Sequence, residues 1–255
     1  MAVAALKAAI IIDEKRIDPM GGISLSDDEN PLVGILMLET TFPRIRGDIG
    51  NPETFPFPVR YRIVKGASPR KVVIDADAGL LDSFIDAGRQ LAARGVKAIA
   101  TSCGFLALFH RQLVKALSVP VFTSSLLQVH MARTLIRSDQ KVGVITARRA
   151  SLTDAHLAGV GIQGCPLAIV GMEDAEEFSS VFIGGQEILD ESQCRREMQA
   201  AAKRLIHTHP HVGAIVLECT NMPPYADTVR QITELPVFDA VTLVNYAYNV
   251  VSERS

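Results

Sequence analysis

The chain has 255 residues, of which 48% are hydrophobic and 21% are charged, a composition typical of a globular protein with a large buried core. Its formal charge of −2 and its 5% of aromatic residues, with no Trp, argue against a nucleic-acid or anionic membrane partner. Four cysteines without CxxC or Cys/His spacing indicate neither a disulfide framework nor a zinc site, so we expect a cytoplasmic protein with reduced thiols.

The N-terminal run Met1–Ile12 is apolar but lacks an early basic region, and it is too short to span a bilayer. It runs directly into the charged residues Asp13-Glu14-Lys15-Arg16. We therefore expect an appended helix or short strand rather than a secretory signal. Residues 1–30 have no further assignment.

From residue 31 onward, short apolar runs alternate with amphipathic segments, the pattern of an α/β protein with parallel sheets. Leu32–Leu38 is predicted as a buried strand. The stretch Glu39–Pro58 carries four prolines and is predicted as a long irregular loop, a kind of segment that is often functional. Tyr61–Val64 and Val72–Ile74 are predicted as further strands.

Helical periodicity then places Leu81, Phe84 and Leu91 on one face, and Gly95 stands where a left-handed C-terminal cap belongs. The predicted strand Val96–Ala100 follows, ending at Thr101-Ser102-Cys103, and a second helix begins after Gly104. The remaining predicted elements, in chain order, are strand Val119–Phe122, helix Ser125–Arg137, strand Val142–Thr146, helix Ser151–Leu157, strand Leu167–Val170, helix Asp190–His207, strand Val212–Leu217, helix Tyr225–Thr233, strand Val237–Phe238 and a terminal helix through Tyr248.

An internal repeat connects two of the four cysteines. Residues 95–103 match residues 211–219, with Val, Ala, Ile and the final Cys in common. At the same offset, Pro120-Val121-Phe122 matches Pro236-Val237-Phe238. The repeat predicts two similar α/β units, each with a cysteine, Cys103 or Cys219, at the carboxyl end of a parallel strand. Ligands bind at that end of open parallel sheets, so we expect both thiols to face one cleft.

Two thiols on opposite faces of one carbon atom suit the inversion of a stereocentre without a cofactor. One cysteine removes the proton as a thiolate, and the other returns a proton to the far face. Each cysteine precedes an expected helix start, whose N–H groups bind a carboxylate and lower a thiol pKa. Gly104 lets the backbone approach a ligand, while Thr220 and Asn221 supply polar donors. The alternative is that both cysteines are small buried hydrophobic residues.

These motifs resemble those of the aspartate/glutamate racemase superfamily. The resemblance rests on Ala-Thr-Ser-Cys103-Gly-Phe, on Leu-Glu-Cys219-Thr-Asn-Met-Pro-Pro-Tyr225 and on the opening strand Val-Gly-Ile-Leu-Met-Leu-Glu-Thr, and it spans residues 31–255. It implies a two-domain enzyme that is independent of pyridoxal phosphate, with the substrate between the domains. It also implies acid/base roles for Cys103 and Cys219, carboxylate binding by Thr220 and Asn221, and a homodimer or higher homo-oligomer.

The same resemblance implies that both ends of the chain build the first domain. We therefore predict a first α/β domain from residues 31–122 plus 236–255, which carries Cys103. The second α/β domain, residues 123–235, carries Cys219. Each has a mainly parallel sheet flanked by helices, and the two are related by pseudo-symmetry.

One departure bears on the substrate. Glutamate racemases have Cys-Asn-Thr where this chain has Cys103-Gly104-Phe105, which favours a less polar substrate such as a hydantoin or another α-substituted acid. Related decarboxylases keep only the second cysteine, so the pair favours racemisation or isomerisation. The predicted function is a cofactor-independent racemase or epimerase of an amino acid or derivative. A maleate-isomerase-like cis–trans isomerase and a non-catalytic small-molecule-binding protein remain alternatives.

Further candidates for substrate contact lie at strand ends and in the long loop. Arg44, Arg46 and Arg60 can each clamp a carboxylate, and we select Arg44. The string His207-Thr-His209-Pro-His211 ends a helix and is not expected to bind a metal; no cofactor is predicted. The complete set of predicted binding residues is Thr40, Arg44, Ser102, Gly104, Phe105, Thr123, Ser124, Thr220 and Asn221.

Overall fold

The structure is a computed structural model that describes residues 31–253, so the prediction for Met1–Ile12 lies outside the described residues. Two four-stranded sheets form its centre, and every neighbouring strand pair is parallel. This confirms the α/β fold class. The strands are β1 (Val33–Met37), β2 (Val59–Ile63), β3 (Ala98–Thr101) and β4 (Val121–Phe122) in the first sheet, and β5 (Lys141–Thr146), β6 (Leu167–Gly171), β7 (Val212–Leu217) and β8 (Val237–Phe238) in the second.

The two sheets have the same topology. The strand order is β2-β1-β3-β4 in the first sheet and β6-β5-β7-β8 in the second. The strand before Cys103 therefore corresponds to the strand before Cys219, as the repeat predicts. β1, β3 and β7 are buried along their whole length, because helices cover both faces of a parallel sheet, and this is why these strands are continuous apolar runs.

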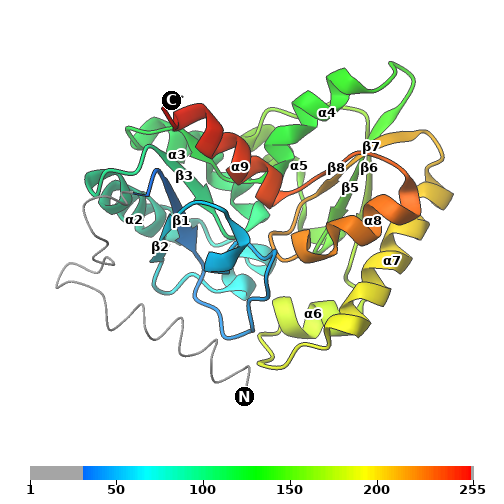
Figure 1. The fold of residues 1–255 in the computed structure, drawn as a ribbon, viewed down its shortest axis with the longest axis horizontal. Coiled ribbons are helices and arrows are strands. Elements are labelled where there is room, and N and C mark those ends of the chain that lie inside the picture. Colours follow the sequence, from blue (N-terminus) through cyan, green and yellow to red (C-terminus); the bar gives the residue numbers. More distant parts are fainter. Residues whose placement is uncertain (1–30, 254–255) are drawn as a thin grey trace.

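Eight α-helices flank the sheets in the described part of the chain (Figure 1). They are α2 (Leu81–Ala93), α3 (His110–Ala116), α4 (Val129–Leu135), α5 (Asp154–Gly159), α6 (Glu176–Phe182), α7 (Glu191–Thr208), α8 (Ala226–Thr233) and α9 (Ala240–Val251). Gly95 follows α2 with a φ of 88°, a left-handed conformation that glycine adopts without strain, which confirms the predicted cap. Among these described helices, none is long and apolar enough to cross a membrane.

The chain passes from one sheet to the other after each fourth strand. α4 follows β4 of the first sheet but packs against β5 and β7 of the second. α9 follows β8 of the second sheet but packs against β1, β3 and β4, where Ala240, Val244 and Ala247 enter the core (Figure 1). Strand pairing thus places β8 in the second sheet, whereas packing places α9 against the first sheet. The domain boundaries near residues 122 and 235 stay a prediction.

Several segments differ from their predicted secondary structure, among them the following three. Val72–Ile74 is not a strand but part of a π-helical turn, Arg70–Ile74, because three apolar residues are too few for periodicity to separate helix from strand. The helix after Gly104 begins as a 3-10 helix, Gly104–Phe109, before α3. α6 has no counterpart among the predicted elements, although its last residue, Phe182, contributes to the wall of the cavity that holds both cysteines.

Candidate active site

Cys103 and Cys219 line one cavity between the two sheets. Cys103 lies two residues beyond the end of β3, and Cys219 lies two residues beyond the end of β7. Because all strands within each sheet are parallel, both cysteines stand at carboxyl ends, as the repeat predicts. The cavity has a volume of about 20 Å³, which is room for about one water molecule. The structure is therefore a closed form of the site.

Hydrogen bonds hold the two cysteine segments together. Thr220 donates its Oγ1 hydrogen to the carbonyl oxygen of Ser102 at 2.6 Å, and Ser102 Oγ accepts from the backbone N–H of Leu38 at 2.8 Å. Behind them, Ser125 donates to the carbonyl oxygen of Leu217 at 2.6 Å. The hydroxyl of Thr220, predicted to bind substrate, thus also joins the end of one sheet to the end of the other.

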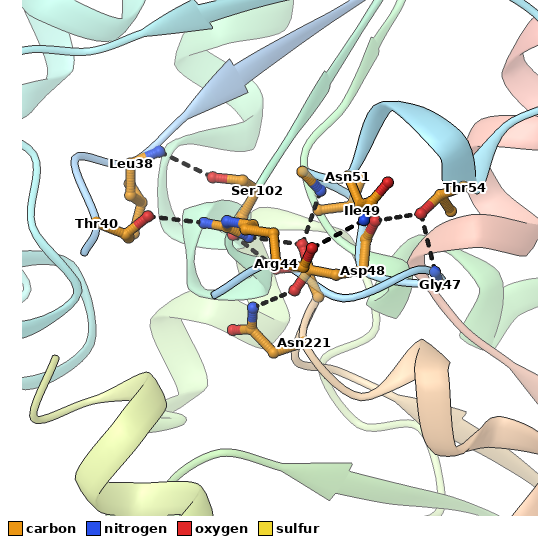
Figure 2. A network of polar contacts seen from close by, with 12 residues as sticks. Leu38, Thr40, Arg44, Gly47, Asp48, Ile49, Asn51, Thr54, Ser102 and Asn221 are labelled. Carbon is orange, nitrogen blue, oxygen red and sulfur yellow. Dashed lines mark hydrogen bonds and ion pairs between the residues drawn. The ribbon is translucent and has the colours of Figure 1, made fainter. Parts of the chain in front are cut away.

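The long loop after β1 carries a buried ion pair, Arg44 with Asp48, of which Arg44 lines the cavity (Figure 2). Arg44 Nη1 donates to Asp48 Oδ1 at 2.8 Å, and the two side chains are only 3% and 2% exposed. Arg44 Nη2 donates to Thr40 Oγ1 at 3.2 Å, while Asn221 Nδ2 donates to Asp48 Oδ2 at 2.6 Å. The guanidinium also lies 4.7 Å from the centre of the Phe42 ring. The network links the loop to the segment after Cys219 and aligns Arg44 in the wall.

A buried glutamate, Glu218, stands directly before Cys219 and also lines the cavity. Its side chain is fully buried, and its Oε2 accepts a hydrogen bond from Thr146 Oγ1 at 2.8 Å, whereas its Oε1 has no hydrogen-bond partner. Burial raises the pKa of this carboxyl group to about 7. A Cβ at Gly104 would collide with Glu218 Oε1 and with the backbone carbonyl oxygen of the same residue, so only glycine fits at position 104.

Burial raises the pKa of both thiols, contrary to the expectation that helix starts lower it. The pKa of Cys103 is raised to about 12, first by burial and then by the negative charge of Glu218. Backbone N–H groups of Phe105 and Leu106 and the charge of Arg44 oppose this rise. The pKa of Cys219 is raised by burial, by Glu218, by Cys103 and by Asp48, and a backbone N–H of Asn221 opposes this rise. Desolvation outweighs the backbone donors at both sites.

The cavity brings most of the predicted binding residues together, but not all. Thr123 and Ser124 are used elsewhere: Thr123 Oγ1 bonds His110 Nδ1 at 3.0 Å, and Ser124 Oγ caps a 3-10 helix by accepting from Leu126 N. Among the three candidate arginines, only Arg44 is on the wall. The predicted residues on the wall are Thr40, Arg44, Ser102, Cys103, Gly104, Phe105, Cys219, Thr220 and Asn221, and those that the sequence missed are Leu38, Phe42, Pro69, Val73, Ala147, Phe182, Ile183 and Glu218.

Comparison with known proteins points to one family and one kind of activity. Residues 68–245 match the Asp/Glu/Hydantoin racemase family. The chain is 32% identical over 226 residues to dimethylsulfoniopropionate lyase of Durusdinium sp. clade D, covering 84% of this chain and 73% of that protein. It is also 32% identical to dimethylsulfoniopropionate lyase 3 of Emiliania huxleyi (strain CCMP1516), covering 85% of this chain but 59% of that longer protein.

Solved structures with the same fold are more distant in sequence. Unliganded arylmalonate decarboxylase is 13% identical with a TM-score of 0.55, over 88% of this chain and 94% of that one. Allantoin racemase from Pseudomonas fluorescens is 14% identical, also with a TM-score of 0.55, over 86% of this chain and 90% of that one. At this identity the likeness shows the fold alone.

The relatives correct the predicted reaction. Proteins about one-third identical over most of the chain are named for a lyase activity, so the predictions of a racemase, an epimerase, a cis–trans isomerase or a non-catalytic binding protein are wrong. The physical reason is that two thiols at strand ends indicate removal of a proton beside a carboxylate. They do not specify what the resulting carbanion does next.

Proposed function

Because the chain belongs to the Asp/Glu/Hydantoin racemase family, we propose that its cavity removes a proton next to a carboxylate and that the reaction it completes is the elimination of a thioether, with dimethylsulfoniopropionate as the substrate. The observation that carries the proposal is the similarity to dimethylsulfoniopropionate lyases. Two cysteines and one arginine in a closed, largely apolar cavity support it.

The chemistry of the substrate needs one base. Dimethylsulfoniopropionate carries a carboxylate and, on the β-carbon, a dimethylsulfonium group. A thiolate takes a proton from the α-carbon, the C–H electron pair becomes the second bond of the alkene, and the C–S electron pair leaves with sulfur. The products are acrylate and neutral dimethyl sulfide, and the proton on the thiol is later released to solvent. Because the departing sulfide is neutral, no acid is required on the opposite face.

The residues of the wall take distinct parts in this reaction. Arg44 holds the substrate carboxylate, since its guanidinium is fixed in place by Thr40 and Asp48. Cys103 is the base, because Arg44 and two backbone N–H groups favour its thiolate, whereas Cys219 has one such N–H group and is further opposed by Asp48; burial and Glu218 raise the pKa of both thiols. Cys219 closes the other side of the cavity.

The substrate reaches the site only when the cavity widens, because one water-sized space is too small for it. We place the entrance for the substrate between the loop after β1 and the end of α6. There the rings of Phe42 and Phe182 meet edge to face with centres 5.2 Å apart, and Thr41 Oγ1 donates to the carbonyl oxygen of Gly185 at 2.8 Å. These contacts join the two segments that we expect to move apart. A homodimer and a cytoplasmic location stay predictions.

The proposal is tested by incubating the full chain with dimethylsulfoniopropionate. Dimethyl sulfide in the headspace is measured by gas chromatography, and acrylate in solution by NMR. We expect both products in equal amounts, at a rate well above that of buffer and of the Cys103→Ala variant. If neither product exceeds the buffer control at any substrate concentration, the lyase assignment is wrong; equal rates for the wild-type protein and Cys103→Ala would reject only Cys103 as the base.

The rate is also expected to rise with pH across the neutral and alkaline range. The raised pKa of Cys103 leaves little thiolate at neutral pH, and below that pKa the thiolate fraction grows about tenfold per pH unit. We therefore expect kcat/KM to climb from about pH 7 to beyond about pH 9, past the point where a free thiol titrates. Initial rates corrected for uncatalysed elimination provide the measurement, and a plateau at lower pH would contradict a buried thiol base.

A further inference from the structure

Among the described residues that line the cavity, two carry charge, and only one of these charges is balanced within the protein. Arg44 pairs with Asp48, so that part of the wall is neutral overall. Glu218 has no cation beside it: Thr146 Oγ1 bonds its Oε2, and its Oε1 is left without a partner. The cavity therefore contains one positive group supported by a counterion and one negative group that lacks one.

An unpaired buried carboxylate is costly unless it meets a cation or takes up a proton. The neighbouring thiols Cys103 and Cys219 cannot supply positive charge, because ionisation makes them anions. The charge of Glu218 indeed raises the pKa of both. The position of Glu218 is nevertheless tightly defined, because any residue larger than glycine at position 104 would collide with its Oε1. Such a group is suited to a ligand that brings its own positive charge.

We propose that Glu218 is the onium-binding group of this cavity, receiving the positively charged sulfonium through its free Oε1. It would thereby select carboxylates that carry an onium group over carboxylates that carry none. The inference rests on the proposed function, because it assigns the second charge of that substrate. Arg44, in the loop after β1, takes the carboxylate, and Glu218, at the end of β7, takes the cation. Both thiols line the same cavity as these two groups.

Aromatic residues complete the subsite. Phe105 and Phe182 line the same cavity, and aromatic rings attract the methyl groups of an onium ion, over which its charge is spread. Binding of the cation also has a consequence for the base. A sulfonium beside Glu218 offsets the negative charge that disfavours the thiolates, so the substrate itself promotes formation of the base.

The test compares two ligands of the same shape that differ only in charge. 3-(Trimethylammonio)propionate carries the onium and lacks a good leaving group, and 4,4-dimethylpentanoate is the carboxylate of the same shape without the positive charge. Their affinities are measured by titration calorimetry at about pH 8, where the Glu218 carboxyl with its pKa about 7 is ionised. We expect the wild-type protein to prefer the onium by about tenfold to a hundredfold.

The variant Glu218→Gln keeps the size of the side chain and removes its charge. We expect it to lose the preference for the onium while its affinity for 4,4-dimethylpentanoate changes by less than about threefold. The matched control is Glu173→Gln, the same chemical change at a carboxylate outside the cavity that accepts from the backbone of Arg149. This control should retain the full preference.

A second measurement serves if Glu218→Gln fails to fold. In the wild-type protein, the preference should disappear as the pH falls through about 7 and Glu218 is protonated. The other facing groups do not produce this change: Arg44 and Asp48 form an ion pair, and burial raises the pKa of the Cys103 and Cys219 thiols, so both thiols stay neutral in this range.

The outcomes separate this inference from the lyase assignment. The subsite is rejected if the wild-type protein shows no preference for the onium ligand. It is also rejected if Glu218→Gln keeps the preference. Both conclusions hold even if dimethyl sulfide is produced. A preference that depends on Glu218 in a protein that forms no dimethyl sulfide would support the subsite and reject the lyase.

Discussion

Replacing Cys103 with alanine is expected to lower kcat for dimethyl sulfide formation by about 10²–10⁴-fold, the usual contribution of a general base. The variant Cys219→Ala should lose less, because elimination needs a base on one face and its leaving group departs without a proton. The distinction between the two thiols rests on their surroundings. Arg44 and two backbone N–H groups favour the thiolate of Cys103, while Cys219 has one favourable N–H group and is opposed by Asp48; burial and Glu218 oppose both thiolates.

The measurement is the rate at saturating substrate for Cys103→Ala, Cys219→Ala and the double variant, with circular dichroism to show that each is folded. The serine variants at both positions are matched controls that preserve volume while replacing the thiol with a much weaker acid. A larger loss in Cys219→Ala would make Cys219 the base. Equal losses would mean that both thiols take part, and full activity in the double variant would exclude thiol catalysis altogether.

Replacing Asp48 with alanine is expected to reduce the free energy of unfolding by about 3–5 kcal/mol. The substitution leaves the guanidinium of Arg44 buried without its counterion, and it also removes the acceptor for Asn221 Nδ2 and for the backbone N–H of Gly50. Activity should fall as well, because the same carboxylate fixes the group that binds the substrate carboxylate. Urea unfolding followed by circular dichroism measures the first effect.

A double-mutant cycle separates the ion pair from the general effects of substitution. Arg44→Met is combined with Asp48→Ala, so that both buried charges are removed together. We expect the double variant to be more stable than the sum of the single changes predicts, because neither charge is then left unpaired. Additive effects to within about 0.5 kcal/mol would show that the two side chains are not coupled.

The sequence predicted the elements whose signals are local. Buried parallel strands appear as continuous apolar runs, and the helix Leu81–Ala93 shows its buried face at helical spacing and its end at Gly95. The repeat alone placed Cys103 and Cys219 at equivalent strand ends, and the two matching sheet topologies confirm that placement. Where the local signal was weak, the prediction was wrong, as at Val72–Ile74, whose three apolar residues form a helical turn.

The outcome of proton removal could not be read from the cysteines. A carbanion beside a carboxylate is reprotonated when the substrate offers nothing better, and it expels a group on the β-carbon when that group leaves easily. Both reactions use the same thiol base, so the pattern around Cys103 and Cys219 fits either one. Similarity to proteins named as lyases over most of the chain favours elimination.

The sequence by itself therefore determined the two sheets, the equivalent strand ends and the pair of thiols, because periodicity and repetition are properties of neighbouring residues. Only the tertiary structure decided what surrounds those thiols. Arg44, Asp48 and Asn221 meet because a long loop folds back onto the segment after β7, and Glu218 emerges as an unpaired charge only once burial removes water from it. Solvent exclusion and contacts between distant segments arise from the packing of the whole chain, and they set the charge balance at the site.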